Sequence, residues 1–320
     1  MTPAPNTQTL VADIGGTNTR VALAEGRTIR EDTIQRFRNA DHPGLESVLR
    51  RYLGDNGDPD CIGACVAVAG PVNDGRGTLT NLDWTIDRDT LARAAQAEKV
   101  AILNDLQAQG HALGHIAESN LKTVIAGTVP LSPNPTRLVI GVGTGFNAAP
   151  VYDLPAGRAV TPSEAGHANM PIRTEADLRL CKFVETAHGF PAVEDVLSGR
   201  GLVRIHRWIS HEAGAPTELS GADIIAAIDD DAVAAQAVAT FIRILGTEAG
   251  NLALIHLPFG GIYLAGGMAR AVAPFFSRFG FEAAFRDKGR FSGFMQGFSV
   301  SVIEDDYAAL TGCACALDAM

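Results

Sequence analysis

The 320-residue sequence predicts a mixed α/β protein with two domains. Short apolar runs typical of strands alternate with segments that repeat their apolar residues every three or four positions, as helices do. Two glycine-rich turns lie in separate halves of the chain, and each stands between two strand-like runs. The chain also exceeds the length that a single core usually fills. The fold class and the number of domains follow from these three observations.

The part of the chain from residue 8 to about residue 112 is predicted to alternate strands and helices. The run Val66–Ala69 is apolar at every position, which is typical of a strand covered on both faces, and Gly70-Pro71 ends it. The predicted strands are Leu10–Ile14, Arg20–Ala24, Cys61–Ala69 and Val100–Leu103. The predicted helices are Gly44–Leu53, Asp89–Ala97 and Leu106–Leu113.

From about residue 113 onward the sequence predicts longer helices, with a loop at 131–135 before the second glycine turn. A strand at Gly261–Gly267 ends in a glycine pair, and a helix is expected to open near Ala269. The other predicted helices are Glu175–His188, Gly201–His211, Ala232–His256 and Tyr307–Leu317. The other predicted strands are Leu138–Ile140, Ala148–Tyr152 and Ser299–Ile303.

The two glycine turns, Asp13–Asn18 and Gly141–Gly145, are the most informative features of the chain. A strand follows each of them, so each is a hairpin whose bare backbone N–H groups can wrap a phosphate. Two such hairpins in separate halves of the chain indicate two domains that close on one nucleotide. The Walker A pattern and the dinucleotide fingerprint both lead into a helix, so neither fits these turns.

The composition excludes several classes of protein. A net charge of −10 is unlike a nucleic-acid binder, which normally presents a basic face. Residues 1–8 contain no recognisable signal peptide, and no apolar run approaches the roughly 18 residues that span a bilayer. The five cysteines are odd in number and form no dense framework, which is typical of a reducing compartment. They lack metal-binding spacing and are expected to fill the core. The sequence therefore predicts a cytoplasmic protein that binds neither nucleic acid nor membrane.

Polar residues with possible chemical roles follow two of the predicted strands. Asn104 and Asp105 come after the strand Val100–Leu103, at the strand end where α/β sheets place their ligands. Either residue could instead cap the next helix. Asp13 lies in an apolar strand beside the first glycine turn, where a carboxylate needs a partner or a cation. A Mg²⁺ ion bound through water would supply one.

Three further polar residues have both a structural and a functional interpretation. Glu164 and His167 lie three residues apart in a predicted loop after Thr161-Pro162. A lone histidine more often has a structural role, but the nearby glutamate favours a role in a functional site. Glu194 precedes a turn, and its simplest interpretation is an exposed helix residue.

Taken together, these segments resemble the bacterial glucokinases, which are hexokinase-like sugar kinases with the actin-like ATPase fold. The resemblance covers almost the whole chain, because six motifs occur in order. They are Asp13–Asn18, Leu103–Asp105, Gly141–Gly145, Glu164–His167, Glu194–Leu202 and Leu264–Gly267. Two more segments are similar to the family, Ala249–Leu254 and Ala284–Phe291.

The resemblance implies a two-domain fold related to ribonuclease H, with mixed sheets and a cleft between the domains. The small domain would comprise residues 8–112 and 301–320, and the large domain residues 113–300. It also implies an ATP-dependent glucokinase that forms glucose 6-phosphate, uses ATP and Mg²⁺, and works as a homodimer.

The resemblance also implies roles for matched positions. Asp105 would be the base that accepts the proton of the sugar 6-hydroxyl, and Asp13 would hold Mg²⁺. The sugar would be bound by Asn104, Asp105, Glu164, His167 and Glu194. The nucleotide would be bound by Ala12, Asp13, Ile14, Gly15, Gly16, Thr17, Asn18, Gly143, Thr144, Gly145, Gly266 and Gly267.

The chain departs from the family pattern at two places. The family usually has Gly-Glu-Gly-Gly-His where this chain has Ser163-Glu164-Ala165-Gly166-His167. It commonly has Gly-Thr-Gly-Leu-Gly in the second hairpin, where Phe146-Asn147 follows Gly145 here. Asparagine tolerates a positive φ better than most residues, so Asn147 is expected to keep the turn.

The sequence leaves two alternatives to a glucokinase open. One is a kinase for another hexose or an amino sugar, and the other is a catalytically weak sugar sensor.

Overall fold

The computed structural model describes residues 7–79, 82–128 and 135–320. Most of the predicted loop at 131–135 lies outside these residues. The chain divides into two compact units, one of residues 1–117, 156–160 and 305–320 and the other of residues 118–155 and 161–304. Residues 113–117 and 156–160 thus fall in the first unit, and residues 301–304 fall in the second. The fold is mixed α/β with several sheets.

The first unit contains two sheets and four α-helices among the described residues. Its strands are β1 (Gln8–Ile14), β2 (Asn18–Glu25), β3 (Thr28–Ile29), β4 (Gln35–Arg38), β5 (Gly63–Val68), β6 (Val72–Asn73), β7 (Arg76–Thr78), β8 (Thr85–Asp87), β9 (Lys99–Asn104) and β13 (Gly157–Val160). Its helices are α1 (Leu45–Asp55), α2 (Arg88–Ala95), α3 (Asp105–Ala112) and α11 (Ala308–Asp318).

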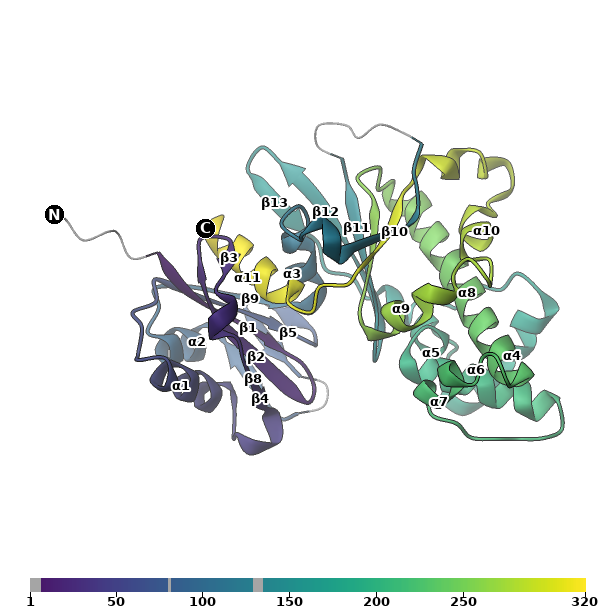
Figure 1. Cartoon of the computed structure of the whole chain (residues 1–320), viewed down its shortest axis with the longest axis horizontal. Helices are drawn as coiled ribbons and strands as arrows, with labels where there is room; N and C mark the ends of the chain where they lie inside the picture. Colours follow the sequence, from purple (N-terminus) through teal and green to yellow (C-terminus); the bar gives the residue numbers. More distant parts are fainter. Residues whose placement is uncertain (1–6, 80–81, 129–134) are drawn as a thin grey trace. The chain divides into compact units, whose positions relative to one another are not determined.

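The larger sheet of the first unit runs in the order β3-β2-β1-β5-β9, with β4 also paired to β2. Strands β1, β5 and β9 are parallel, and β2 runs antiparallel to β1. Because side chains alternate along a strand, Leu10 and Ala12 pack with α1 and α2, whereas Val11 packs with α3 and α11. Figure 1 shows these two helix pairs on opposite faces of the sheet. The prediction of a sheet covered on both faces is therefore confirmed.

The second unit is built around one sheet in the order β10-β15-β14-β11-β12. The strands are β10 (Leu121–Ile125), β11 (Arg137–Val142), β12 (Phe146–Leu154), β14 (Ile262–Ala265) and β15 (Val300–Ile303). The helices are α4 (Glu175–His188), α5 (Val193–Val196), α6 (Gly199–Glu212), α7 (Gly221–Ala226), α8 (Ala232–His256), α9 (Gly267–Val272) and α10 (Phe281–Arg286). A single apolar core joins the sheet to these helices, with the buried Leu138 and Val300 contributed by the sheet and Phe241 by α8.

The longest helix, α8, is long and apolar enough to cross a membrane by length and composition alone. Its apolar residues form no continuous run of about 18 residues, because Gln236, Arg243 and Glu248 interrupt them. Moreover, 67% of its most apolar window is buried in the structure, as in the core helix of a globular unit. Phe241, Ile242 and Leu245 are among its buried residues.

Four of the five cysteines are buried and Cys181 is half-buried, so the prediction that they fill the core holds best for those four. Cys65 and Cys313 lie together on the face of the first unit's sheet that α3 and α11 cover. Burial raises the pKa of the Cys61 thiol to about 11, which keeps that thiol protonated at neutral pH.

Two segments of the second unit resemble the family but have no predicted role in the site, and they contact each other. Lys288 donates through its Nζ to the Thr247 carbonyl at 2.8 Å and to Asn251 Oδ1 at 2.7 Å. Asn251 Nδ2 in turn donates to Glu248 Oε2 at 3.0 Å. A side chain at Gly250 would collide with Phe285. The segments Ala249–Leu254 and Ala284–Phe291 therefore dock α8 against α10.

Replacing Lys288 with methionine is expected to lower the free energy of unfolding by about 1–3 kcal/mol. The methionine keeps the apolar stem but leaves Asn251 Oδ1 and the buried Glu248 carboxylate without their cationic partner. Differential scanning calorimetry measures the change. Arg290→Met, at an exposed position of the same loop, is the matched control and should shift stability by less than about 0.5 kcal/mol. Equal effects of the two variants would contradict the buried network.

Candidate active site

The first glycine turn is a hairpin between β1 and β2, as predicted. The backbone N–H of Gly15 donates to the Asn18 carbonyl at 3.0 Å, which closes the turn. Gly16 and Thr17 at its tip are exposed. The tip therefore presents backbone to solvent, as a phosphate loop requires.

A buried asparagine that the sequence analysis missed holds this turn in place. Asn39 is 1% exposed. Its Nδ2 donates to the Gly15 carbonyl at 2.7 Å, its backbone N–H donates to the Thr17 carbonyl at 2.9 Å, and its Oδ1 accepts from Thr19 Oγ1 at 2.8 Å. No local pattern around residue 39 signals this role, because the partners are about 20 residues away in sequence.

Asp13 has a protein partner. In the antiparallel register of β1 and β2 it stands opposite Arg20, and Arg20 Nη1 lies 3.3 Å from Asp13 Oδ2. Burial raises the pKa of the Asp13 carboxyl, and the Arg20 guanidinium acts in the opposite direction. A carboxylate in an apolar strand needs a partner or a cation, and Arg20 is such a partner.

Asn104 caps helix α3, so the structural interpretation is confirmed for this residue. Its Oδ1 accepts from the Leu106 N–H at 3.0 Å, and Gln107 Oε1 accepts from the Asn104 N–H at 3.0 Å, which completes a capping box. Asn104 Nδ2 also donates to the Gly70 carbonyl at 3.0 Å. The cap fixes where the strand ends and the helix begins, and it thereby fixes the position of Asp105.

Asp105 is the first residue of α3, and its Oδ1 accepts from the Leu106 N–H at 2.8 Å. Burial raises the pKa of this carboxyl to about 6, and the negative charge of Asp13 adds to the effect. The parallel register aligns Ile14 with Val68 and Val68 with Asn104. Asp105 and the first glycine turn therefore lie at the same carboxyl edge of the sheet, where α/β proteins bind ligands.

The second glycine turn is also a hairpin, between β11 and β12. The Gly143 N–H donates to the Gly145 carbonyl at 2.9 Å, and the Gly143 carbonyl accepts from the Gly199 N–H at 2.8 Å. Glu194 Oε2 accepts from the Phe146 N–H at 3.1 Å, and a side chain at Gly145 would overlap this carboxylate. The interpretation of Glu194 as an exposed helix residue was therefore wrong, since its side chain is only 27% exposed and lies against the turn.

The second hairpin is kept with asparagine at position 147, as expected, but not through a positive φ. Asn147 lies in β12, and it is not among the described residues with a positive φ. Its side chain instead holds the loop that carries Glu164. The extended backbone at this position explains why a residue with a Cβ is accepted where the family pattern has glycine.

Glu164 and His167 lie in that loop, with Ala165–His167 in a short 3₁₀ turn. Glu164 Oε2 and His167 Nε2 are 3.9 Å apart, and both side chains are about two-thirds exposed. A side chain at Gly166 would overlap the Phe146 carbonyl. The loop therefore packs against the start of β12, immediately after the glycine turn.

Gly266 ends β14 with a φ of 101°, a value that favours glycine, and Gly267 opens α9. A side chain at Gly266 would lie 2.6 Å from the Val142 carbonyl oxygen. The glycine pair therefore lies beside the second hairpin. Within the second unit, the structure thus gathers this hairpin, Glu194, the Ser163–His167 loop and Gly266.

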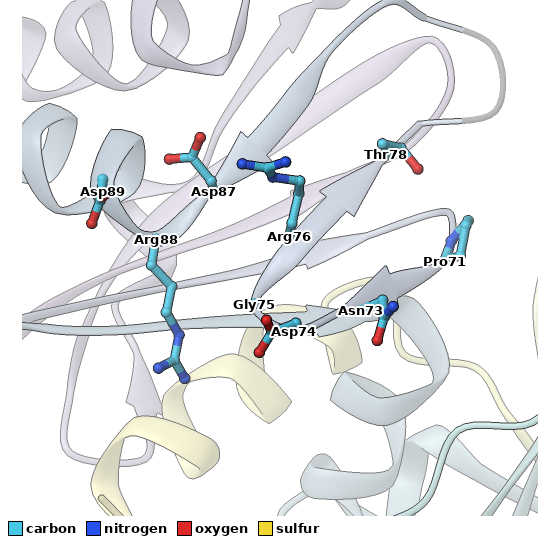
Figure 2. Close-up of a pocket in the computed structure, with 9 residues that line it drawn as sticks. All are labelled: Pro71, Asn73, Asp74, Gly75, Arg76, Thr78, Asp87, Arg88 and Asp89. Carbon is cyan, nitrogen blue, oxygen red and sulfur yellow. The ribbon is translucent and has the colours of Figure 1, made fainter.

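Two surface pockets in the described residues contain none of these groups. One, of about 650 Å³, lies over β6, β7 and β8, and Figure 2 shows the arginines and aspartates that line it. Asp87 accepts from the Thr90 N–H at 2.7 Å and so caps α2, and the hydrogen bonds with Thr90 lower the pKa of its carboxyl, with a smaller contribution from Arg76 and Arg93. The other pocket lies between β10 and the residues around α10. Asp87 thus has a structural role in the cap, and neither pocket is a stronger candidate than the glycine turns.

An α/β fold with two glycine hairpins, and with a carboxylate of raised pKa beside one of them, defines a phosphoryl-transfer protein of the sugar-kinase class. The glucokinase family model matches residues 10–320, and the chain belongs to this family. It is therefore a transferase that phosphorylates a sugar.

Known proteins agree with this assignment. The glucokinase of Erwinia tasmaniensis is 33% identical over 306 residues, which cover 95% of this chain and 94% of that protein. The crystal structure of a glucokinase from an Antarctic psychrotroph has a TM-score of 0.83 at 29% identity, covering 98% of this chain and 99% of that one. A ROK family glucokinase from Streptomyces griseus, in complex with glucose and AMPPNP, has a TM-score of 0.60 at 19% identity, with 96% and 98% coverage. At that identity, the likeness to the last protein shows the fold alone.

Proposed function

We propose that this enzyme transfers the γ-phosphoryl group of ATP to the 6-hydroxyl of D-glucose and releases glucose 6-phosphate and ADP. The observation that carries the proposal is Asp105, a carboxylate with a pKa of about 6 at the edge of the sheet that also bears the first glycine turn. A base with this pKa is ionised at neutral pH and still accepts a proton readily. The actin-like arrangement of two domains that contribute to one active site is part of the proposal.

Asp105 accepts the proton of the 6-hydroxyl as the sugar oxygen attacks the γ-phosphorus. The bond from that phosphorus to the β–γ bridging oxygen breaks, ADP leaves, and the proton passes from the Asp105 carboxyl to water. Asn104, Glu164, His167 and Glu194 bind the other sugar hydroxyls. The carboxylates accept from hydroxyls, and the amide and imidazole groups can both donate and accept.

The nucleotide is held by main-chain amides. The hairpins Gly15–Thr17 and Gly143–Gly145 supply N–H groups to the phosphates, with Ala12, Ile14 and Asn18 flanking the first of them. Gly266 and Gly267 lie against the adenosine. A net charge of −10 gives the protein no general attraction for ATP, so local dipoles must supply it. The AMPPNP in the Streptomyces griseus structure supports ATP as the donor.

The residues around Asp13 fit a magnesium ion. The negative charge of Asp13 contributes to the raised pKa of Asp105, so the two carboxylates repel each other. A hard divalent cation that prefers oxygen ligands relieves such repulsion. Among the described residues no three His, Cys, Asp or Glu side chains gather to hold a metal. Asp13 would therefore hold Mg²⁺ through water, and the bound ion would neutralise charge on the phosphates.

We further propose that the enzyme acts as a homodimer in the cytoplasm and supplies glycolysis with glucose 6-phosphate. The family resemblance supports the dimer, and the cysteine usage supports the compartment. A kinase for another hexose or amino sugar, and a weak sugar sensor, are the alternatives.

The test is ADP release by the purified protein, coupled to a spectrophotometric assay, with ATP or polyphosphate as donor and glucose, mannose, fructose, galactose and glucosamine as acceptors. The expected result is the highest kcat/KM with glucose and ATP, and no turnover without Mg²⁺. A higher kcat/KM with another sugar would show that this sugar, and not glucose, is the preferred substrate. Calorimetric binding of glucose without ADP release would show that the protein is a sugar sensor and not a kinase.

A further inference from the structure

The side chain of Asn147 makes its hydrogen bonds to the loop that carries Glu164. Its Oδ1 accepts from the Ala165 N–H at 3.0 Å and from Ser163 Oγ at 3.1 Å, and its Nδ2 donates to the Ser163 carbonyl. Oδ1 also accepts from the Ala148 N–H at 2.8 Å. One side chain thus connects the start of β12 to both residues that flank Glu164.

The two departures from the family pattern contact each other. Ser163 and Asn147 both stand where that pattern has glycine, and the Ser163 hydroxyl lies 3.1 Å from Asn147 Oδ1 and 2.7 Å from the Ala148 carbonyl oxygen. A glycine at both positions would remove every one of these side-chain contacts. The polar pair therefore supplies bonds between β12 and the loop that glycines could not make.

The residue before Asn147 contacts the remaining sugar-binding candidates of this unit. The Phe146 N–H donates to Glu194 Oε2, and the Phe146 carbonyl lies where a side chain at Gly166 would have to be. Phe146 and Asn147 thus hold Glu194 on one side and the Ser163–His167 loop on the other. The side chains of Glu164 and His167 are themselves mostly exposed, so the path of the loop backbone decides where they point.

We propose that Asn147 is a positioning residue for the sugar: through its bonds to Ser163 and Ala165 it fixes Glu164 and His167 relative to Glu194 and so sets the affinity for the hexose. This proposal rests on the sugar-binding roles given above. Asn147 acts through the loop and touches no reacting atom. Its loss should weaken sugar binding and leave the binding of ATP nearly unchanged, because the hairpin keeps the bond from the Phe146 N–H to Glu194 and the bond from the Gly199 N–H to the Gly143 carbonyl.

The first test measures the loop without any activity. Hydrogen–deuterium exchange of the Ser163–His167 segment should be at least several-fold faster in Asn147→Gly than in the parent enzyme, because the Ala165 N–H loses its acceptor. Asn120→Gly is the control, since the Asn120 side chain has no hydrogen-bond partner among the described residues. Unchanged exchange of the segment in Asn147→Gly would overturn the proposal even if the enzyme phosphorylates glucose.

The second test is a double-mutant cycle on glucose binding. Asn147→Gly should raise the glucose Kd by roughly three- to tenfold, with the KM for ATP changed by less than about twofold. Ser163→Gly should have a smaller effect, and the double variant should bind glucose about as weakly as Asn147→Gly alone, since the pair acts as one unit. Ser163→Thr keeps the hydroxyl and should restore the parent Kd.

Two kinetic results would overturn the proposal. One is strictly additive effects of the two glycine substitutions, and the other is a rise in the KM for ATP equal to that for glucose. If the parent enzyme does not bind glucose at all, the proposed function fails, and the exchange measurement still decides whether Asn147 orders the loop.

Discussion

Replacing Asp105 with asparagine is expected to lower kcat by about 10²–10⁴, the usual contribution of a positioned base. Asparagine has nearly the same shape, and its Oδ1 can still accept from the Leu106 N–H, so helix α3 begins at the same place. It cannot take the proton of the sugar hydroxyl. Because the side chain can still hydrogen-bond the sugar, the glucose Kd measured by calorimetry should rise far less than kcat falls.

The pH dependence provides an independent check on this residue. The base works only when ionised, so kcat/KM should fall as the pH drops through about 6, the pKa to which burial raises the Asp105 carboxyl. The residual activity of Asp105→Asn should lack this acidic limb. Asp89→Asn, in the exposed first turn of α2, is the matched control and should behave as the parent enzyme does. A variant at position 105 that retains more than about a tenth of the parent kcat would remove the residue from its role as base.

Much of the fold could be predicted because its signals are local. Helices Glu175–His188 and Ala232–His256 were predicted with the bounds that the structure has, since their apolar periodicity is long and regular. Both glycine hairpins were predicted because glycine and the flanking apolar runs are adjacent in sequence. The strands β6, β7 and β8 were missed because each has only two or three residues, too few for an alternating pattern.

The contacts that shape the site could not be predicted, since they join residues far apart in sequence. Asn39 lies 24 residues from the Gly15 carbonyl that it holds, and Glu194 lies 48 residues from the Phe146 N–H. In each case the sequence shows only an ordinary polar residue in a short loop or helix. The role of the Asn147 side chain could not be predicted for a related reason: its partners, Ser163 and Ala165, lie 16 and 18 residues away in sequence.

The second large effect is expected at Gly312, where α11 passes closest to α3. A Cβ at this position would overlap the carbonyl oxygen of Ala108. Backbone cannot swing aside as a flexible side chain can, so Gly312→Ala must push the two helices apart. Overpacking of this kind costs about 1–3 kcal/mol or more. Calorimetry should therefore show a clearly lower Tm for the variant.

Gly312→Ala should also reduce activity, because the helix that it displaces begins at Asp105. The expected loss lies in kcat more than in the KM for ATP, since the atoms nearest the added methyl group all belong to Ala108 of α3. Gly54→Ala is the matched control: this glycine lies near the end of helix α1, and nothing stands within 4 Å of the place that an alanine methyl group would take. The control should gain about 0.5–1 kcal/mol, because alanine favours a helix. If both variants raise the Tm, then α3 and α11 are not packed closely enough for their contact to hold Asp105 in place.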